Sequence, residues 1–211
     1  MNVRSFSLRP HKRGKVPPWK LALLLIAAGV LGRLVLWEMP NVEPVMAVAL
    51  IAGMLLGGYY VILVPVAVMV GTDVLTYALG WSGAYSPVQI LGLGAFVYSG
   101  FVLAAAIGQA YRPRLLFRTR TIAVMARISI PATILFDLWT AFGDWLAISR
   151  HPPMNWSLGH VLEMQVPFTL VHLASSLIFV PIFGTLFLYL HTHGWPTAGP
   201  SPSGTDDSGP E

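Results

Sequence analysis

The chain has 211 residues, of which 55% are hydrophobic and only 10% are charged, whereas a soluble globular domain carries roughly 25% charged residues. It contains no cysteine, which excludes disulfides, thiol catalysis and cysteine-ligated metals. The formal net charge is +4, but the basic residues flank apolar blocks, a pattern typical of a membrane protein rather than of a nucleic-acid-binding one.

The apolar residues are gathered in long blocks, and a bilayer core about 30 Å thick needs about 20 apolar residues per helix. We therefore expect an all-α integral membrane bundle of six transmembrane helices, multi-pass in the cell membrane. The first block follows a basic run but no small-residue cleavage site comes after it, which predicts a retained helix. The expected spans are residues 19–37, 44–57, 59–80, 88–111, 121–148 and 160–190.

The second and third spans are the hardest to delimit. Residues 44–80 are too many for one straight span and slightly too few for two full ones. Gly57 and Gly58 predict a break between them, because paired glycines disrupt a helix at a tight turn. The helix before the break is then expected to be short, shallow or tilted.

The last block, 160–190, is longer than one span needs. An interfacial turn over residues 157–165 is therefore expected before Pro167 opens the true span. Other prolines are expected inside helices, which membrane proteins tolerate when neighbouring groups satisfy the freed carbonyls. These prolines are Pro65, Pro131 and Pro181.

Lysine and arginine in the loops predict the orientation. With six spans, both basic patches fall on one side, which must be the cytoplasm. The predicted parts are a basic cytoplasmic segment at 1–18, a membrane domain at 19–190 and a disordered cytoplasmic tail at 191–211. The basic patches comprise Arg4, Arg9, Lys12, Arg13, Lys15 and Lys20 at the amino-terminal end, and Arg112, Arg114, Arg118 and Arg120 between spans four and five.

Polar and ionisable residues inside a membrane are costly and usually face the bundle interior or a wet cavity. Counted at about 1.5 Å per residue from the cytoplasmic ends, most of them fall in the outer half or its loops, which predicts a pocket that opens outward. The group comprises Arg33, Trp37, Glu38, Asn41, Glu43, Asp73, Tyr77, Trp81, Tyr85, Gln89, Asp137, Asp144, Trp145, Trp156, His160, Glu163 and His172.

Several of these residues also have a purely structural interpretation. Tryptophan and tyrosine near an interface most often form an aromatic belt. Arg33 either binds a ligand or has a structural role, in which it snorkels or pairs with Asp73. Asp137 and Asp144 are seven residues apart and share one helix face, which allows a paired site. His172 is better explained as a hydrogen-bonded core residue than as a metal ligand, and we expect neither a metal nor a cofactor.

Small residues at four-residue spacing let membrane helices approach closely. Ala28 and Gly32 lie on the first span, and Ala49, Gly53 and Gly57 lie on the second. The spacing recurs at Ala104 and Gly108 on span four. Packing inside the bundle is the favoured explanation, and a partner-docking surface formed by Ala28, Gly32, Ala49 and Gly53 is the alternative.

The stretch from Arg33 to Gly80 resembles the front half of substrate-binding S components of energy-coupling factor (ECF) transporters, in an uncharacterised branch. The shared features are Arg33 at the end of span one, a Pro-Asn-x-x-Pro loop at 40–44, an Ala-x-Ala-Leu helix at 47–50 and Asp73 closing span three. The rear half matches through Trp139, Phe142-Gly143-Asp144-Trp145 and Pro167-Phe168.

This resemblance implies a six-helix subunit that captures a vitamin or similar micronutrient from outside. Such subunits work with a transmembrane coupling subunit and cytoplasmic ATPases. The sequence has no Gly-x-x-x-x-Gly-Lys-Ser/Thr phosphate loop, so we expect the partners to hydrolyse ATP and the chain itself not to be an enzyme. Under this hypothesis Arg33 holds an anionic group, Asp73 and Asp137 accept hydrogen bonds, and Trp37, Trp81 and Trp145 stack on a ring.

Two other functions stay open. An intramembrane aspartyl hydrolase would use two aspartates that share a proton, but the sequence has Phe-Gly-Asp at 142–144 where such enzymes have Gly-x-Gly-Asp. A structural or assembly protein without a ligand would instead fill its bundle with side chains and have no outward cavity.

Overall fold

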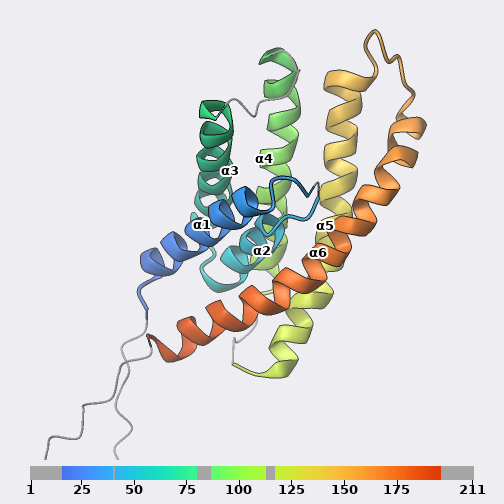
Figure 1. Ribbon diagram of the computed structural model, residues 1–211. Helices are drawn as coiled ribbons and strands as arrows, with labels where there is room; N and C mark the ends of the chain where they lie inside the picture. Colours follow the sequence, from blue (N-terminus) through green and yellow to red (C-terminus); the bar gives the residue numbers. More distant parts are fainter. Residues whose placement is uncertain (1–15, 40, 80–86, 113–116, 196–211) are drawn as a thin grey trace, which may run out of the picture.

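The computed structural model describes residues 16–39, 41–79, 87–112 and 117–195. Within these ranges all regular structure is helical (Figure 1). Trp81, Tyr85 and the predicted tail beyond residue 195 lie outside the described residues. The elements are α1 (Pro18–Val35), α2 (Val45–Leu55), α3 (Tyr60–Ala78), α4 (Pro87–Ala110), α5 (Thr119–Asp144), a π-helical turn η1 (Trp145–Ser149) and α6 (Leu158–His193).

The expected all-α fold is confirmed, and each helix lies within a few residues of its predicted span. Four stretches are long and apolar enough to cross a membrane: Pro18–Val35, Leu91–Ala110, Thr119–Ser149 and Leu158–His193. The apolar parts of the other two helices, Val45–Leu55 and Tyr60–Thr76, are shorter. Apolar helices of this length are typical of a membrane protein.

Helix α2 lies at the centre of the bundle. It has 11 residues, about 16 Å of helix, and all of them are buried. It ends where predicted, because Gly57 and Gly58 adopt left-handed φ angles of 63° and 57° that glycine alone adopts without strain. The prediction of a short helix before the break is therefore correct.

Helix α2 packs tightly against α4 through two glycines. A Cβ atom on Gly53 would lie 1.8 Å from the backbone oxygen of Ala105, and one on Gly108 would lie 2.3 Å from that of Leu50. Both distances are far below contact range, so only glycine permits this crossing. The small-residue spacing on α2 and α4 thus forms a contact inside the bundle.

Helix α6 does not begin at Pro167, and the expected interfacial turn at 157–165 is wrong. The helix starts at Leu158 and continues through Pro167 for 36 residues. Ser157 caps it, because its hydroxyl accepts the backbone N–H of His160 at 3.2 Å. A proline removes only one backbone hydrogen bond, which a long helix with packed neighbours tolerates. Pro65, Pro131 and Pro181 also lie inside helices, as predicted.

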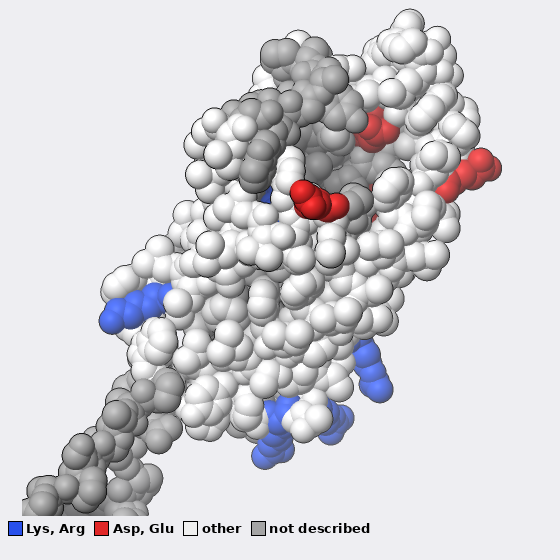
Figure 2. All heavy atoms as spheres, in the orientation of Figure 1, with Lys and Arg blue, Asp and Glu red and all other residues white. Residues whose placement is uncertain are grey.

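Charged side chains differ between the two ends of the bundle. Figure 1 places the α4-to-α5 connection at the lower end, and Arg112, Arg118 and Arg120 flank it. On the face drawn in Figure 2, the projecting Lys and Arg side chains lie toward the lower end. The Asp and Glu side chains lie toward the upper end, around a hollow. The sequence prediction that acidic groups gather at one end agrees with this view.

Candidate functional site

Arg33 and Asp73 form an ion pair between two helices, which agrees with the structural interpretation of Arg33 given above. Arg33 lies in the last turn of α1, and its Nη1 atom is 3.5 Å from Oδ1 of Asp73 on α3. The same nitrogen donates hydrogen bonds to Thr72 Oγ1 at 3.0 Å and to Met69 Sδ at 2.7 Å. The two charged side chains retain 20% and 33% of their surface, so the pair is accessible from one side.

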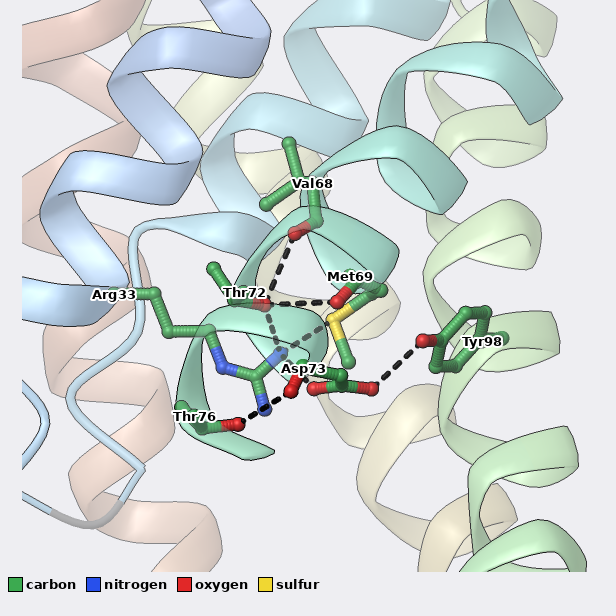
Figure 3. Close-up of polar contacts among 7 residues, drawn as sticks. All are labelled: Arg33, Val68, Met69, Thr72, Asp73, Thr76 and Tyr98. Carbon is green, nitrogen blue, oxygen red and sulfur yellow. Dashed lines mark hydrogen bonds and ion pairs between the residues drawn. The ribbon is translucent and has the colours of Figure 1, made fainter. Parts of the chain in front are cut away.

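A third helix completes this group through Tyr98. The Tyr98 hydroxyl on α4 donates a hydrogen bond to Oδ2 of Asp73 at 2.7 Å. Figure 3 shows Arg33 reaching from α1 toward α3, and the Tyr98 ring pointing from α4 toward the same carboxylate. Asp73 therefore has a partner at each oxygen, and three helices that are distant in sequence meet at one carboxylate.

A cavity of about 150 Å³ adjoins this group. Arg33, Asp73 and Tyr98 contribute its polar atoms together with Gln89 from the first turn of α4. The remaining walls come from Met69, Leu93, Gly94, Val97 and Ile148. A mainly apolar cavity of this volume can hold one small ring, because an apolar cavity of similar volume in another protein binds benzene.

Asp137 and His172 form a second polar pair, on α5 and α6. Nδ1 of His172 lies 2.8 Å from Oδ1 of Asp137, and both side chains are only 2% exposed. The other polar atoms, Asp137 Oδ2 and His172 Nε2, have no hydrogen-bond partner among the described residues. The interpretation of His172 as a hydrogen-bonded core histidine is confirmed.

Together with nearby hydroxyl groups, the Asp137–His172 pair forms a row of polar contacts along α5 and α6, here called the polar seam. One turn from the pair, the hydroxyls of Thr133 and Ser176 are 2.9 Å apart. Ser175, on the same side of α6 as His172, donates to the backbone oxygen of Glu43 at 3.4 Å. The seam is buried, and it joins α5, α6 and the loop before α2.

Asp144 and Trp145 lie at the end of α5, away from Asp137. The Ser149 hydroxyl donates to Oδ2 of Asp144 at 2.5 Å. The intervening π turn explains this bond, because its i→i+5 register places residue 149 beneath residue 144. Trp145 Nε1 donates to the backbone oxygen of Trp156 at 3.1 Å. Asp137 and Asp144 thus bind different partners and do not form the paired site that their spacing allowed.

The other predicted binding residues are spread over the loop after α1. Trp37 is 41% exposed, Glu38 is exposed, and Asn41 and Glu43 are half-buried. Asn41 has a left-handed φ of 62°, a conformation that asparagine tolerates better than most residues. The side chain of Tyr77 and all of Trp81 lie outside the described part of the chain, so the structure does not place them.

The predicted partner-docking residues mostly face inward. Ala49 and Gly53 are buried within the bundle, which excludes them from contact with a partner in this arrangement. A Cβ atom on Gly32 would lie 2.5 Å from Pro44, so Gly32 serves the contact between α1 and the start of α2. Ala28 is half-buried and packs against the core. Each of the four residues therefore takes part in packing inside the bundle.

Sequence reasoning missed Met69, Thr72 and Tyr98. The signal for Tyr98 was present, because it is a phenol in the middle of an apolar block. The only indication for Thr72 was its position beside Asp73. Met69 gave no signal, since an apolar residue in an apolar helix is indistinguishable from core packing.

Comparison with known proteins identifies the family but not an activity. The fold and the buried polar pairs define a helical membrane protein with an accessible cavity between α1, α3 and α4. A family model described as "Family of unknown function (DUF6580)" matches residues 15–197, and the chain belongs to this family. No curated protein and no solved structure matches the chain.

Proposed function

We propose that the chain is an S-component-like membrane subunit that captures a small micronutrient, a vitamin or a precursor, from outside the cell. The cavity beside Arg33, Asp73 and Tyr98 is the observation that carries this proposal. Uptake would then follow the ECF scheme, with a transmembrane coupling subunit and cytoplasmic ATPases as partners. The resemblance of residues 33–80 to S components supports this assignment.

The position of the cavity supports capture from outside. Its residues come from the last turn of α1, the carboxyl half of α3, the first half of α4 and the η1 turn. Arg112, Arg118 and Arg120 lie at the opposite ends of α4 and α5. The positive-inside rule assigns the arginine-rich end to the cytoplasm, so the cavity belongs to the outer end. This orientation requires six crossings, with both termini in the cytoplasm and α2 as a short, deeply buried element.

The buried pair between α5 and α6 favours a second candidate, a structural or assembly protein. Asp137 pairs with His172, and Thr133 pairs with Ser176, inside the bundle, and none of the four lines the cavity beside Arg33. Interhelical polar contacts of this kind stabilise membrane bundles that have no ligand. The two candidates differ in a single respect, which is whether the cavity beside Arg33 is ever occupied.

Ligand binding to the purified protein distinguishes these candidates. We expect at least one member of a panel of vitamins and precursors to bind and to raise the thermal unfolding temperature in detergent. Arg33→Gln and Asp73→Asn should abolish that shift, because each removes a polar group at the cavity. Arg127→Gln and Glu163→Gln, which change exposed residues elsewhere, are the matched controls. A folded wild-type protein that binds no member of the panel would support the structural role instead.

A further inference from the structure

The guanidinium of Arg33 has donors that the protein does not use. Its three polar contacts, to Met69, Thr72 and Asp73, all involve Nη1. Nη2 and Nε have no hydrogen-bond partner among the described residues, and the side chain lines the cavity. A guanidinium presents its donors in a planar fork that matches the two oxygens of a carboxylate.

Asp73 has less remaining capacity to accept hydrogen bonds than a free carboxylate has. Tyr98 occupies Oδ2 and Arg33 faces Oδ1, so both oxygens are already engaged. The site therefore has two guanidinium nitrogens without a partner among the described residues, whereas each oxygen of Asp73 already has one. A ligand that supplies acceptor oxygens complements this arrangement, whereas a ligand that carries only a cationic amine does not.

The ion pair also limits how much negative charge the site can hold. At 3.5 Å the contact between Nη1 and Oδ1 is longer than the about 2.7–2.9 Å of a strong charge-assisted hydrogen bond, but it still balances much of the arginine charge. One guanidinium that is partly neutralised matches a monoanion better than a phosphate dianion. Apolar walls formed by Leu93, Val97 and Ile148 add to the cost of a second negative charge.

From the unused fork, the engaged Asp73 and the cavity of about 150 Å³, we infer that the ligand is a compact aromatic or heteroaromatic monocarboxylate. Its carboxylate binds Nη2 and Nε of Arg33, and its single ring lies between Leu93, Gly94 and Val97. This inference rests on the proposed function and assigns the chemical class of its substrate.

Four probes of known chemistry test the assignment on the full-length protein in detergent. Benzoate is the monocarboxylate, benzamide its uncharged counterpart, phenyl phosphate the dianion and 2-naphthoate the two-ring carboxylate. We expect benzoate to bind at least about 10-fold more tightly than benzamide, because a hydrogen bond to a charged group is worth about one to two factors of ten. Phenyl phosphate and 2-naphthoate should also bind more weakly than benzoate.

Two variants locate the preference at this cavity. Arg33→Gln should bind benzoate and benzamide equally, whereas the Arg127→Gln control should keep the preference. Gly94→Leu retains the guanidinium and fills the cavity from the opposite wall, where an added Cβ meets no atom within 4 Å. This variant should fold and lose benzoate binding. It therefore tests whether benzoate binds in this cavity even if Arg33→Gln does not fold.

The outcomes separate this inference from the proposed function. Equal binding of benzoate and benzamide by the wild-type protein, or a preference that survives in both variants, overturns the carboxylate assignment. If a member of the vitamin panel binds but none of the probes does, the function stands and the ligand class is wrong. If neither the panel nor the probes bind, both proposals fail.

Discussion

Asp137 and His172 are held inside an apolar bundle because they form a hydrogen bond with each other. An unpaired polar or charged group in such an environment is very costly, whereas a hydrogen-bonded pair costs much less. Their contact at 2.8 Å fixes the rotation of α5 relative to α6. The outer atoms of the pair, Asp137 Oδ2 and His172 Nε2, have no hydrogen-bond partner among the described residues.

Single substitutions in this pair should be much more harmful than the double one. His172→Ala leaves the Asp137 carboxylate buried without a partner and should lower the free energy of unfolding by about 3–5 kcal/mol. Asp137→Asn keeps a hydrogen-bonding group and should cost less. The double variant Asp137→Leu/His172→Leu should come within about 1 kcal/mol of the wild-type protein, since apolar replacement of a buried pair is often neutral. Unfolding titrations in detergent measure all three.

A double variant that is as unstable as His172→Ala would contradict this account. It would mean that the pair has contacts beyond its own hydrogen bond, for instance with groups outside the described residues. An additive double variant would show that the two side chains act independently.

At the scale of single residues, the sequence predicted one of the two polar pairs between helices but not the other. The possible pair of Arg33 with Asp73 could be named because both fall near the outer ends of neighbouring spans. Asp137 with His172 could not, because that pairing depends on the rotation of two long helices about their axes. Tyr98 was missed for the same reason, since hydropathy does not show which face of α4 meets α3.

Helix α2 is a short, fully buried element whose backbone approaches that of α4 closely. It carries no charged residue between Val45 and Leu55, and its closest contacts to α4 are those permitted by Gly53 and Gly108. Close approach of helices increases dispersion contacts, which drive packing where no hydrophobic effect operates between helices. The position of α2 between α4, α5 and α6 therefore depends on the absence of two Cβ atoms.

Gly53→Ala should destabilise the protein although alanine favours helices. The added Cβ would overlap the carbonyl of Ala105, so α2 and α4 must separate, at a cost of about 1–3 kcal/mol. Gly159→Ala is the matched control, because the Cβ atom there meets only Ser157 Oγ, at 3.9 Å. The control should be neutral or more stable by up to about 1 kcal/mol. Thermal unfolding that ranks the two variants equally would contradict this packing.

At the scale of elements, the length of the apolar blocks predicted every helix, and Gly57 with Gly58 predicted the break after α2. The continuation of α6 through Pro167 was not predicted, because a proline reads as a boundary unless neighbouring packing is known. The π turn after Asp144 has no recognisable sequence signal, and only its i→i+5 bonds reveal it.

The whole molecule is polarised along its long axis. Arginines flank the connection from α4 to α5 at one end, and the cavity and most of the described acidic side chains lie toward the other. We propose that this second end faces outward and that the cavity beside Arg33 is open to water-soluble molecules there. Such an arrangement is required for capture from outside and is irrelevant to a purely structural protein.

Cysteine accessibility tests this claim most directly, because the chain has no cysteine of its own. Gly94→Cys places a thiol in the cavity without a clash, and Thr119→Cys places one at the exposed first residue of α5. In intact cells, a membrane-impermeant maleimide should label Gly94→Cys, while Thr119→Cys should react only after permeabilisation. Gly94→Cys that stays unlabelled from outside, or Thr119→Cys that reacts without permeabilisation, would contradict the account.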